Sequence, residues 1–282
     1  MNARIQGSAE AGPDWDPRAL LQHAGGSQTA SAAEVELLHR FDSAVATMEL
    51  LSREDQTHVR AVLETIVQGQ AMDLKRFSGA TADRLTALRR LEETEDYTFR
   101  VAGCVGEFWT RECASHLVSA HEWDERSQVE DGIRFGKGLQ WVNILRDLPR
   151  DLRMGRCYLP SEELAEVGLV PKHLLAITAW TQLKPLYLKW TDHAEEHLNA
   201  GWRYLMRTPA HQRRLRFASA VPLVLGYRTL SLLRNGNPLD PQSRIKASRA
   251  EVRSALWQIA LACLGLRGWS QIQSWARESR SR

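Results

Sequence analysis

The chain has 282 residues, of which 43% are hydrophobic and 25% charged, and 37 Lys and Arg against 34 Asp and Glu leave a formal net charge of +3. This is the composition of an ordinary globular protein, which excludes a disordered or collagen-like chain and gives no basis for bulk electrostatic binding to nucleic acid. The four cysteines show no CxxC spacing, so the sequence predicts neither a disulfide framework nor a zinc knuckle.

Residues 1–33 are rich in Gly, Ala, Ser and Pro and are predicted to form an irregular N-terminal segment. From residue 34 onward, apolar residues recur every three or four positions, which indicates amphipathic helices. Almost no segment alternates with a period of two, so residues 34–282 are predicted to form a single all-α domain. Helices are expected at about residues 35–48, 52–77, 81–91, 97–117, 131–148, 164–167, 174–207, 215–233 and 248–266.

No apolar run reaches the length of a membrane-spanning helix, and the first residues lack the apolar core of a signal peptide. The expected location is therefore cytoplasmic, with peripheral contact at the inner membrane surface as an option. A run of arginines could touch anionic lipid, although a solvated helix end is the ordinary expectation for such a run. These arginines are Arg203, Arg207, Arg213, Arg214 and Arg216.

A column of polar residues is the sharpest local feature of the sequence. Asn143, Asp147 and Asp151 follow one another at intervals of four, and Gln140 stands three before Asn143, so all four share one face of a helix. Two carboxylates one turn apart repel each other unless a cation lies between them, and such oxygen ligands suit Mg²⁺. The alternative is a solvated helix face on which neighbouring arginines pair with the carboxylates.

Pro149 interrupts this column, because proline lacks the amide proton that a helix needs. We expect a kink there that leaves Asp147 and Asp151 facing the same cavity. Arg153 and Arg156 follow directly, and guanidinium groups suit bidentate contacts with phosphate. Surface ion pairs are the alternative role for these arginines.

Two segments resemble the signatures of a known family. Residues 140–160, QWVNILRDLPRDLRMGRCYLP, resemble the second aspartate-rich signature of the squalene/phytoene synthase family, and residues 97–107, YTFRVAGCVGE, resemble its other signature. The resemblance covers about residues 35–235 and is nearest to the bacterial squalene synthase branch. It implies an isoprenoid (terpenoid) synthase helical bundle around a central apolar cavity.

The resemblance also implies an activity, the head-to-head condensation of two farnesyl diphosphates through presqualene diphosphate to squalene. The alternatives are a phytoene synthase that uses geranylgeranyl diphosphate and a non-catalytic member that acts as an assembly factor. The implied cofactor is Mg²⁺, and squalene formation would also need NADPH. An allylic diphosphate is the expected partner, while substrate chain length and oligomeric state stay open.

Carried over residue by residue, the resemblance makes Tyr97, Asp147 and Asp151 catalytic. Asp147, Asp151 and Asn143 would bind the metal. The residues expected to bind substrate are Gln140, Asn143, Arg146, Arg153, Arg156 and Tyr158. Four aromatic residues near the signatures could line the channel, although simple packing is the more ordinary role for each. They are Phe108, Trp109, Phe135 and Trp141.

The sequence departs from the family at its N-terminal end, where the first aspartate-rich motif is expected. Asp14 and Asp16 stand two apart among prolines, and neither Glu54 nor Asp55 has an acidic partner four residues on. An internal start at Met1 or a loss of chemistry would explain this departure. The chain as given is therefore expected to be weakly active.

Three further expectations concern single residues. Asp73 could add a carboxylate to the cavity, but an ion pair with Arg76 is favoured by the helical spacing. Glu107 and Arg111 are expected to pair one helical turn apart. The nine histidines show no HExxH motif, so zinc is not expected.

Overall fold

The computed structural model describes residues 36–37, 40–117, 122–243 and 245–278. The predicted irregular segment 1–33, with Asp14 and Asp16, lies outside these residues. The chain divides into two compact units, Met1–Val67 and Gln68–Arg282, which are described separately. The single domain predicted over residues 34–282 stays a prediction.

The first unit contains α4 (Phe41–Glu49) and most of α5 (Arg53–Arg76), which continues into the second unit. The α5 helix begins where the sequence predicts, because the Ser52 hydroxyl accepts a hydrogen bond from the Asp55 amide at 3.1 Å and so caps the first turn. The helix ends before Gly79, whose φ of +64° is the left-handed conformation that glycine adopts without strain.

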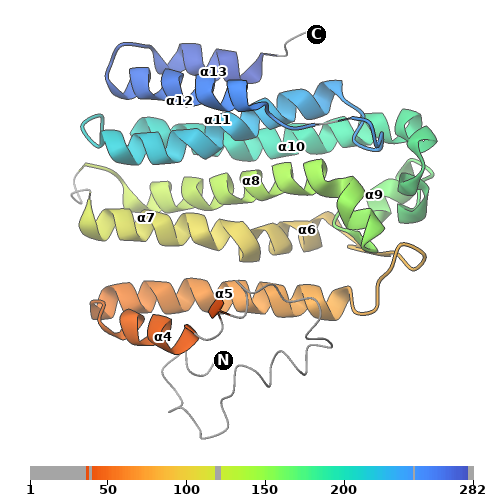
Figure 1. Ribbon diagram of the computed structural model, residues 1–282, viewed down its shortest axis with the longest axis horizontal. Coiled ribbons are helices and arrows are strands. Elements are labelled where there is room, and N and C mark those ends of the chain that lie inside the picture. Colours follow the sequence, from red (N-terminus) through yellow and green to blue (C-terminus); the bar gives the residue numbers. More distant parts are fainter. Residues whose placement is uncertain (1–35, 38–39, 118–121, 244, 279–282) are drawn as a thin grey trace, which may run out of the picture. The chain divides into compact units, whose positions relative to one another are not determined.

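The second unit is built almost entirely from helices, as Figure 1 shows. After α5 come β1 (Thr86–Ala87), α6 (Leu91–Thr98), a π-helical turn (Phe99–Gly103), α7 (Cys104–His116), α8 (Glu125–Arg153), β2 (Arg156–Cys157), α9 (Ser161–Glu166), two 3₁₀ turns (Pro171–Leu175 and Ile177–Ala179), α10 (Trp180–Arg207), α11 (Arg213–Asn235), α12 (Arg249–Cys263) and α13 (Trp269–Arg277). Among the described residues, no helix combines the length and apolarity needed to span a membrane.

Helix α8 is the centre of this unit and packs against α7, α10 and α11. Its apolar residues Trp141, Leu145 and Leu148 are fully or almost fully buried, as are Tyr187 and Trp190 on α10. Because these side chains leave water on folding, the face of α8 opposite the polar column anchors the helix in the core.

The α8 helix runs through Pro149 without ending, and the structure shows why it can. Proline has no amide proton to donate to the carbonyl four residues earlier, which is that of Leu145. The buried hydroxyl of Tyr187 on α10 donates to this same carbonyl oxygen at 3.0 Å. A side chain from a neighbouring helix thus satisfies the acceptor that the proline leaves unpaired.

Replacing Tyr187 by Phe should therefore lower the free energy of unfolding by about 1–3 kcal/mol, because it leaves the buried Leu145 carbonyl without a donor. Urea denaturation followed by circular dichroism measures this loss. Replacing Tyr97 by Phe is the matched control, because the Tyr97 hydroxyl bonds to the Tyr158 side chain and not to a backbone carbonyl of α8. Equal destabilisation by both substitutions would contradict the assignment.

Helices α7 and α8 approach closely through small residues. A Cβ atom added to Gly106 would lie 2.0 Å from the Gly132 carbonyl oxygen, and one added to Gly136 would lie 2.3 Å from the Ala102 carbonyl oxygen. Glycine is therefore needed at both positions for the backbones to meet.

The structure corrects two expected elements and adds one. Residues 81–91 do not form a helix, because Thr86 and Ala87 pair in parallel with Arg156 and Cys157, and the Leu88 amide donates to the Cys157 carbonyl at 3.0 Å. Helix α10 begins at Trp180 rather than near residue 174, after two 3₁₀ turns. Helix α13 was not expected from the sequence pattern.

Candidate functional site

A polar pocket of about 230 Å³ lies along the C-terminal half of α8. It is lined by Tyr97, Gln140, Asn143, Ile144, Arg146, Asp147, Asp151 and Tyr158. All of these except Ile144 were expected to be site residues. The structure also confirms that Asp147 and Asp151 face the same cavity.

Asp147 is held by its neighbour in the chain. The Nε and Nη2 atoms of Arg146 donate to its two carboxylate oxygens at 2.8 and 2.6 Å. This bond raises the pKa of Arg146 above its ordinary value. Both side chains are a little over one third exposed, so the guanidinium also remains accessible to an anion in the pocket.

Asp151 is less well compensated. Burial, and then the charge of Asp147, raise the pKa of Asp151 to about 6, against the opposing effect of Arg150 and Arg156. The pocket therefore holds more negative charge than its own cations neutralise. A divalent cation would relieve this repulsion, and the carboxylates together with the Asn143 amide oxygen form the all-oxygen donor set that Mg²⁺ takes.

This raised pKa predicts two opposite pH dependences. Mg²⁺-dependent binding of a diphosphate should fall as the pH drops below about 6, because the protonated carboxyl of Asp151 cannot hold the metal. Without metal, the pKa of Asp151 is about 6 in the folded protein and about 3.9 in the unfolded chain. Between these two pH values the folded protein holds the proton more tightly. The free energy of unfolding should then decrease as the pH rises through that window.

Isothermal titration calorimetry of diphosphate binding in the presence of Mg²⁺ measures the first effect. Urea denaturation without metal measures the second, and both are run from pH 4.5 to pH 8. The loss of stability should be about 1–2 kcal/mol after allowance for partial exposure of the carboxyl. In Asp151→Asn both effects should be much smaller. A variant that keeps the wild-type pH profile would rule out Asp151 as their origin.

Two tyrosines close one side of the pocket. The rings of Tyr97 and Tyr158 stack with centroids 4.6 Å apart, and Phe77 meets Tyr158 edge-on at 5.1 Å. Burial raises the pKa of both hydroxyls, so each keeps its proton and can donate a hydrogen bond. The stack joins the α6 signature to the segment that follows β2.

Arg156 is not among the residues that line the pocket, although its charge acts on Asp151. Its Nη1 pairs with Asp73 Oδ2 at 3.3 Å, and its guanidinium lies 5.9 Å from the centre of the Phe77 ring. The expected Asp73–Arg76 pair is therefore wrong, since Arg76 pairs with Glu93 at 3.4 Å instead. The pairing of β1 with β2 brings Arg156 to α5, which the spacing within α5 could not reveal.

Arg153 also lies away from the polar pocket. It lines a separate cavity of about 360 Å³ with Pro149, Pro238 and Asp240, among others. Arg146 lines both cavities. Of the three arginines expected to bind substrate, Arg146 lines the polar pocket, and the charge of Arg156 acts on the Asp151 carboxyl.

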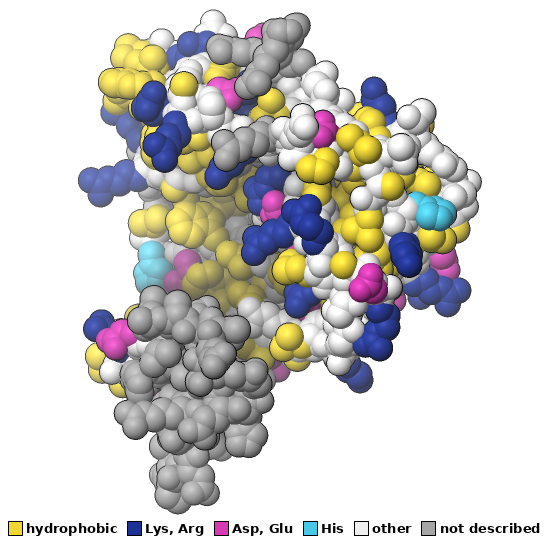
Figure 2. All heavy atoms as spheres, turned by 45° about the vertical axis from the view of Figure 1, so that its right-hand side comes forward, with side chains coloured by type: hydrophobic (Ala, Val, Ile, Leu, Met, Phe, Trp, Pro, Cys, Tyr) yellow, Lys and Arg dark blue, Asp and Glu magenta, His cyan; other side chains and the backbone are white. Residues whose placement is uncertain are grey.

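An apolar cavity of about 390 Å³ lies next along the same helices. It is lined by Val101, Ala102, Val105, Gly106, Trp109, Gly132, Phe135, Gly136, Leu139, Tyr204, Ala218, Ser219 and Pro222. Leu139 on its wall is followed in the chain by Gln140 on the polar pocket, and Val101 follows Tyr97 by one helical turn. On the face shown in Figure 2, charged side chains likewise gather beside hydrophobic ones.

The aromatic residues expected near the channel divide into two groups. Trp109 and Phe135 line the apolar cavity. Trp141 is instead fully buried, with its indole N–H donating to Glu95 at 2.6 Å, and Phe108 does not line this cavity.

Other residues of the cavity wall were not expected from the sequence. Val101 and Val105 stand eight and four residues before Trp109, and this spacing places them on the same helix face. Tyr204 and Pro222 reach the cavity from α10 and α11, and no local signal points to them.

Three arginines of the run at the end of α10 and the start of α11 bond to groups of the protein, although four of the five are exposed. Arg203 and Arg207 bond to the buried carboxylate of Asp131 at 2.5 and 2.9 Å, and Arg216 donates to the Thr208 carbonyl at 2.8 Å. Contact of this run with a lipid surface stays a prediction. The expected Glu107–Arg111 pair is confirmed at 2.9 Å.

Known proteins resemble this chain in sequence. The family model of squalene/phytoene synthase matches residues 17–251. The presqualene diphosphate synthase of Rhodopseudomonas palustris is 28% identical over 214 residues, which cover 75% of this chain and 66% of that protein. The bifunctional lycopene cyclase/phytoene synthase of Arthroderma gypseum is 32% identical over 135 residues, which cover 48% of this chain and 22% of that protein. The chain thus spans about two thirds of the first relative and about a fifth of the second.

A solved structure shows the same architecture. TcSQS in complex with BPH1237 matches with a TM-score of 0.71 and 18% sequence identity, over 100% of this chain and 82% of that chain. At this identity the likeness shows the fold alone. The all-α isoprenoid synthase fold expected from the sequence is confirmed.

Proposed function

The chain belongs to the squalene/phytoene synthase family, whose members are prenyltransferase-type enzymes that act on prenyl diphosphates, and from this premise we propose that it condenses two farnesyl diphosphates head to head. The product sequence would run through presqualene diphosphate to squalene. One observation carries the proposal: a polar pocket with two carboxylates and an apolar cavity follow one another along α8. A charged head group and a hydrocarbon tail need this order of surfaces.

Asp147, Asp151 and Asn143 are the residues proposed to hold Mg²⁺, and their oxygen donors and surplus negative charge fit that ion. When bound, Mg²⁺ supplies charge neutralisation of a diphosphate leaving group. Arg146 adds a second cation at the same pocket and can bind the anion through its accessible guanidinium. Gln140 can fix the orientation of the head group by hydrogen bonding.

Tyr97 and Tyr158 are proposed to act as proton-bearing hydroxyls at the junction of the two cavities. Because their pKa values are raised, they donate hydrogen bonds without adding negative charge near the leaving group. A hydrocarbon tail in the apolar cavity would displace water, which would otherwise quench an allylic cation. Trp109 and Phe135 present aromatic rings that can stabilise positive charge there.

Slow turnover is part of the proposal. Among the described residues, the carboxylates that line the polar pocket are Asp147 and Asp151, both from α8. A diphosphate held by one acidic cluster is neutralised less than one held by two facing clusters. NADPH would be needed for the reductive step to squalene, whereas presqualene diphosphate forms without it.

Phytoene synthesis from geranylgeranyl diphosphate is the second candidate, and the bifunctional lycopene cyclase/phytoene synthase relative favours it. A non-catalytic role as an assembly factor is less favoured, because the carboxylates and Arg146 still share one pocket. The two candidate enzymes differ in the length of hydrocarbon that the apolar cavity must hold.

Product analysis tests these functions. The purified chain is incubated with Mg²⁺ and either farnesyl or geranylgeranyl diphosphate, with and without NADPH, and the diphosphate fraction and the organic extract are analysed by mass spectrometry. A C30 product from farnesyl diphosphate supports the proposal, and a C40 product supports phytoene synthesis. A folded protein that binds neither diphosphate in the presence of Mg²⁺ would overturn both.

A further inference from the structure

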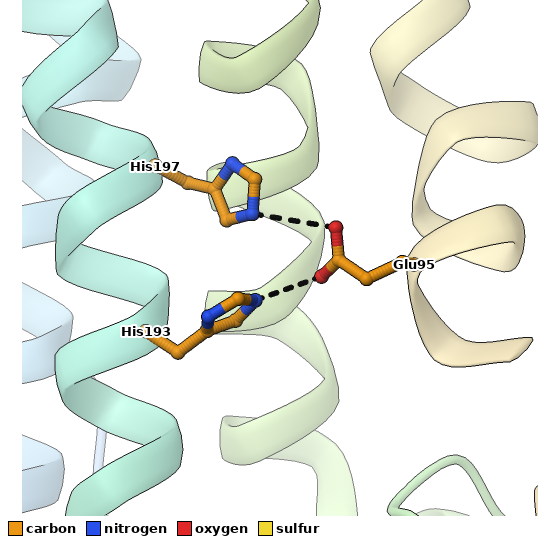
Figure 3. A group of neighbouring side chains, drawn as sticks. All are labelled: Glu95, His193 and His197. Atoms are coloured by element: carbon orange, nitrogen blue, oxygen red, sulfur yellow. Dashed lines mark hydrogen bonds and ion pairs between the residues drawn. The ribbon is translucent and has the colours of Figure 1, made fainter. Parts of the chain in front are cut away.

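A second polar cluster lies outside the polar pocket and joins α6 to α10. Figure 3 shows the imidazoles of His193 and His197 extending from α10 toward the carboxylate of Glu95 on α6. The Nε2 atom of His193 lies 2.8 Å from Oε1 of Glu95, and the Nε2 atom of His197 lies 3.4 Å from Oε2. The same nitrogen of each ring thus faces a different oxygen of one carboxylate.

The cluster is shielded from solvent. The His197 side chain is 9% exposed, that of Glu95 22% and that of His193 29%. The two imidazole rings are nearly perpendicular, with centroids 4.9 Å apart. The rings are therefore fixed by packing, and their Nε2 atoms converge on one point without a rearrangement of the helices.

We propose that Glu95, His193 and His197 form a binding site for a divalent transition-metal ion of the Zn²⁺ class. One ligand atom from each residue lies within 4.8 Å of the other two. Histidines four residues apart on a helix present both rings to one ion, and two imidazoles with one carboxylate are a ligand set that Zn²⁺ accepts. Nitrogen ligands disfavour Mg²⁺, so this site differs in chemistry from the pocket on α8.

Two further contacts orient the carboxylate. The indole N–H of Trp141 donates to Glu95 Oε1 at 2.6 Å, and the Lys137 ammonium forms an ion pair with Oε2. A neutral donor such as the Trp141 indole fixes the direction of a metal ligand. Lys137 is also a competitor, because its positive charge occupies the carboxylate that the metal would use. The affinity for metal is therefore set by the balance between Lys137 and the two imidazoles.

The consequence of metal binding would be structural. Glu95 stands two residues before Tyr97, so a metal at this site would tie the start of the α6 signature to α10. The inference goes beyond the proposed function and does not depend on it. The sequence expectation against zinc relied on the HExxH pattern, whereas here the carboxylate ligand comes from 98 residues upstream of His193.

Titration with Zn²⁺ tests the site. Excess Mg²⁺ is present throughout, so that the carboxylates of α8 are occupied. Wild-type protein should bind one Zn²⁺ that His197→Gln loses, with an affinity change larger than the roughly 10- to 100-fold that loss of an outer-shell partner costs. His211→Gln is the matched control, since that histidine is 62% exposed and pairs with Glu122. Its Zn²⁺ affinity should equal that of the wild type.

A second variant keeps the test decisive if His197→Gln does not fold. Lys137→Met removes the competing ammonium and should raise the affinity for Zn²⁺ at least several-fold. With Co²⁺ in place of Zn²⁺, the wild type should show the intense visible absorption of a low-coordinate site. Wild-type protein that binds no Zn²⁺, binding that is unchanged in His197→Gln, or an unchanged or lowered affinity in Lys137→Met would each overturn the proposal.

Discussion

Replacing Asp147 by Asn is expected to lower kcat/KM for the prenyl diphosphate by a factor of about 10²–10³, the loss typical when one preorganised electrostatic group is removed from a reacting centre. The substitution removes a proposed metal ligand and also frees Arg146, which donates two hydrogen bonds to this carboxylate. Asp151 stays as the one carboxylate on this face of α8, and one carboxylate holds a divalent cation less firmly than two.

Steady-state kinetics over a range of Mg²⁺ concentrations measure this effect. The Mg²⁺ concentration needed for half-maximal activity should rise as well. This rise separates a metal ligand from a residue that only supports the fold. Asp192→Asn is a matched control, because Asp192 lies on α10, is 69% exposed and pairs with Arg234. Kinetics of Asp147→Asn that equal those of this control would show that the polar pocket is not the reacting centre.

Replacing Gly106 by Ala should have the largest effect on stability, a loss of about 3 kcal/mol in the free energy of unfolding. Overpacking typically costs about 1–3 kcal/mol, and here the clash is with backbone rather than with a flexible side chain. The new Cβ would lie 2.0 Å from the Gly132 carbonyl oxygen and 2.5 Å from its carbon, so α7 and α8 must separate. Gly106 and Gly132 also line the apolar cavity, which would change shape.

Urea denaturation measures the loss, with Gly268→Ala as the control. A Cβ at Gly268 meets nothing closer than 3.7 Å, and that residue has an ordinary negative φ. In a helix, glycine-to-alanine substitution alone should stabilise by about 0.5–1 kcal/mol, so any net loss in Gly106→Ala is due to the helix contact. A gain in stability would mean that the two helices do not pack as closely as described.

The polar column on α8 could be predicted because it depends on one helix only. The intervals between Asn143, Asp147 and Asp151 fix their common face wherever that helix lies. The helix continues past Pro149, because Tyr187 supplies a donor from α10. That donor lies 42 residues away, beyond what local spacing can show.

The substrate-binding arginines illustrate the same limit. Arg146 stands within the regular part of α8 and reaches the polar pocket, as expected. Arg156 stands after Gly155, whose φ of +82° turns the chain into β2, and the side chain meets Asp73 instead. The helix predicted over residues 81–91 failed for a related reason, since pairing with β2 outweighed the local apolar spacing.

The sequence by itself determined the all-helical class, the family and the shared face of the two carboxylates, because helical periodicity and contiguous signatures are properties of neighbouring residues. Only the tertiary structure decided which side chains meet across helices. It placed the apolar cavity beside the polar pocket, and it brought Glu95 together with His193 and His197. Such contacts depend on how whole helices pack, and packing is set by burial summed over many residues that are distant in the chain.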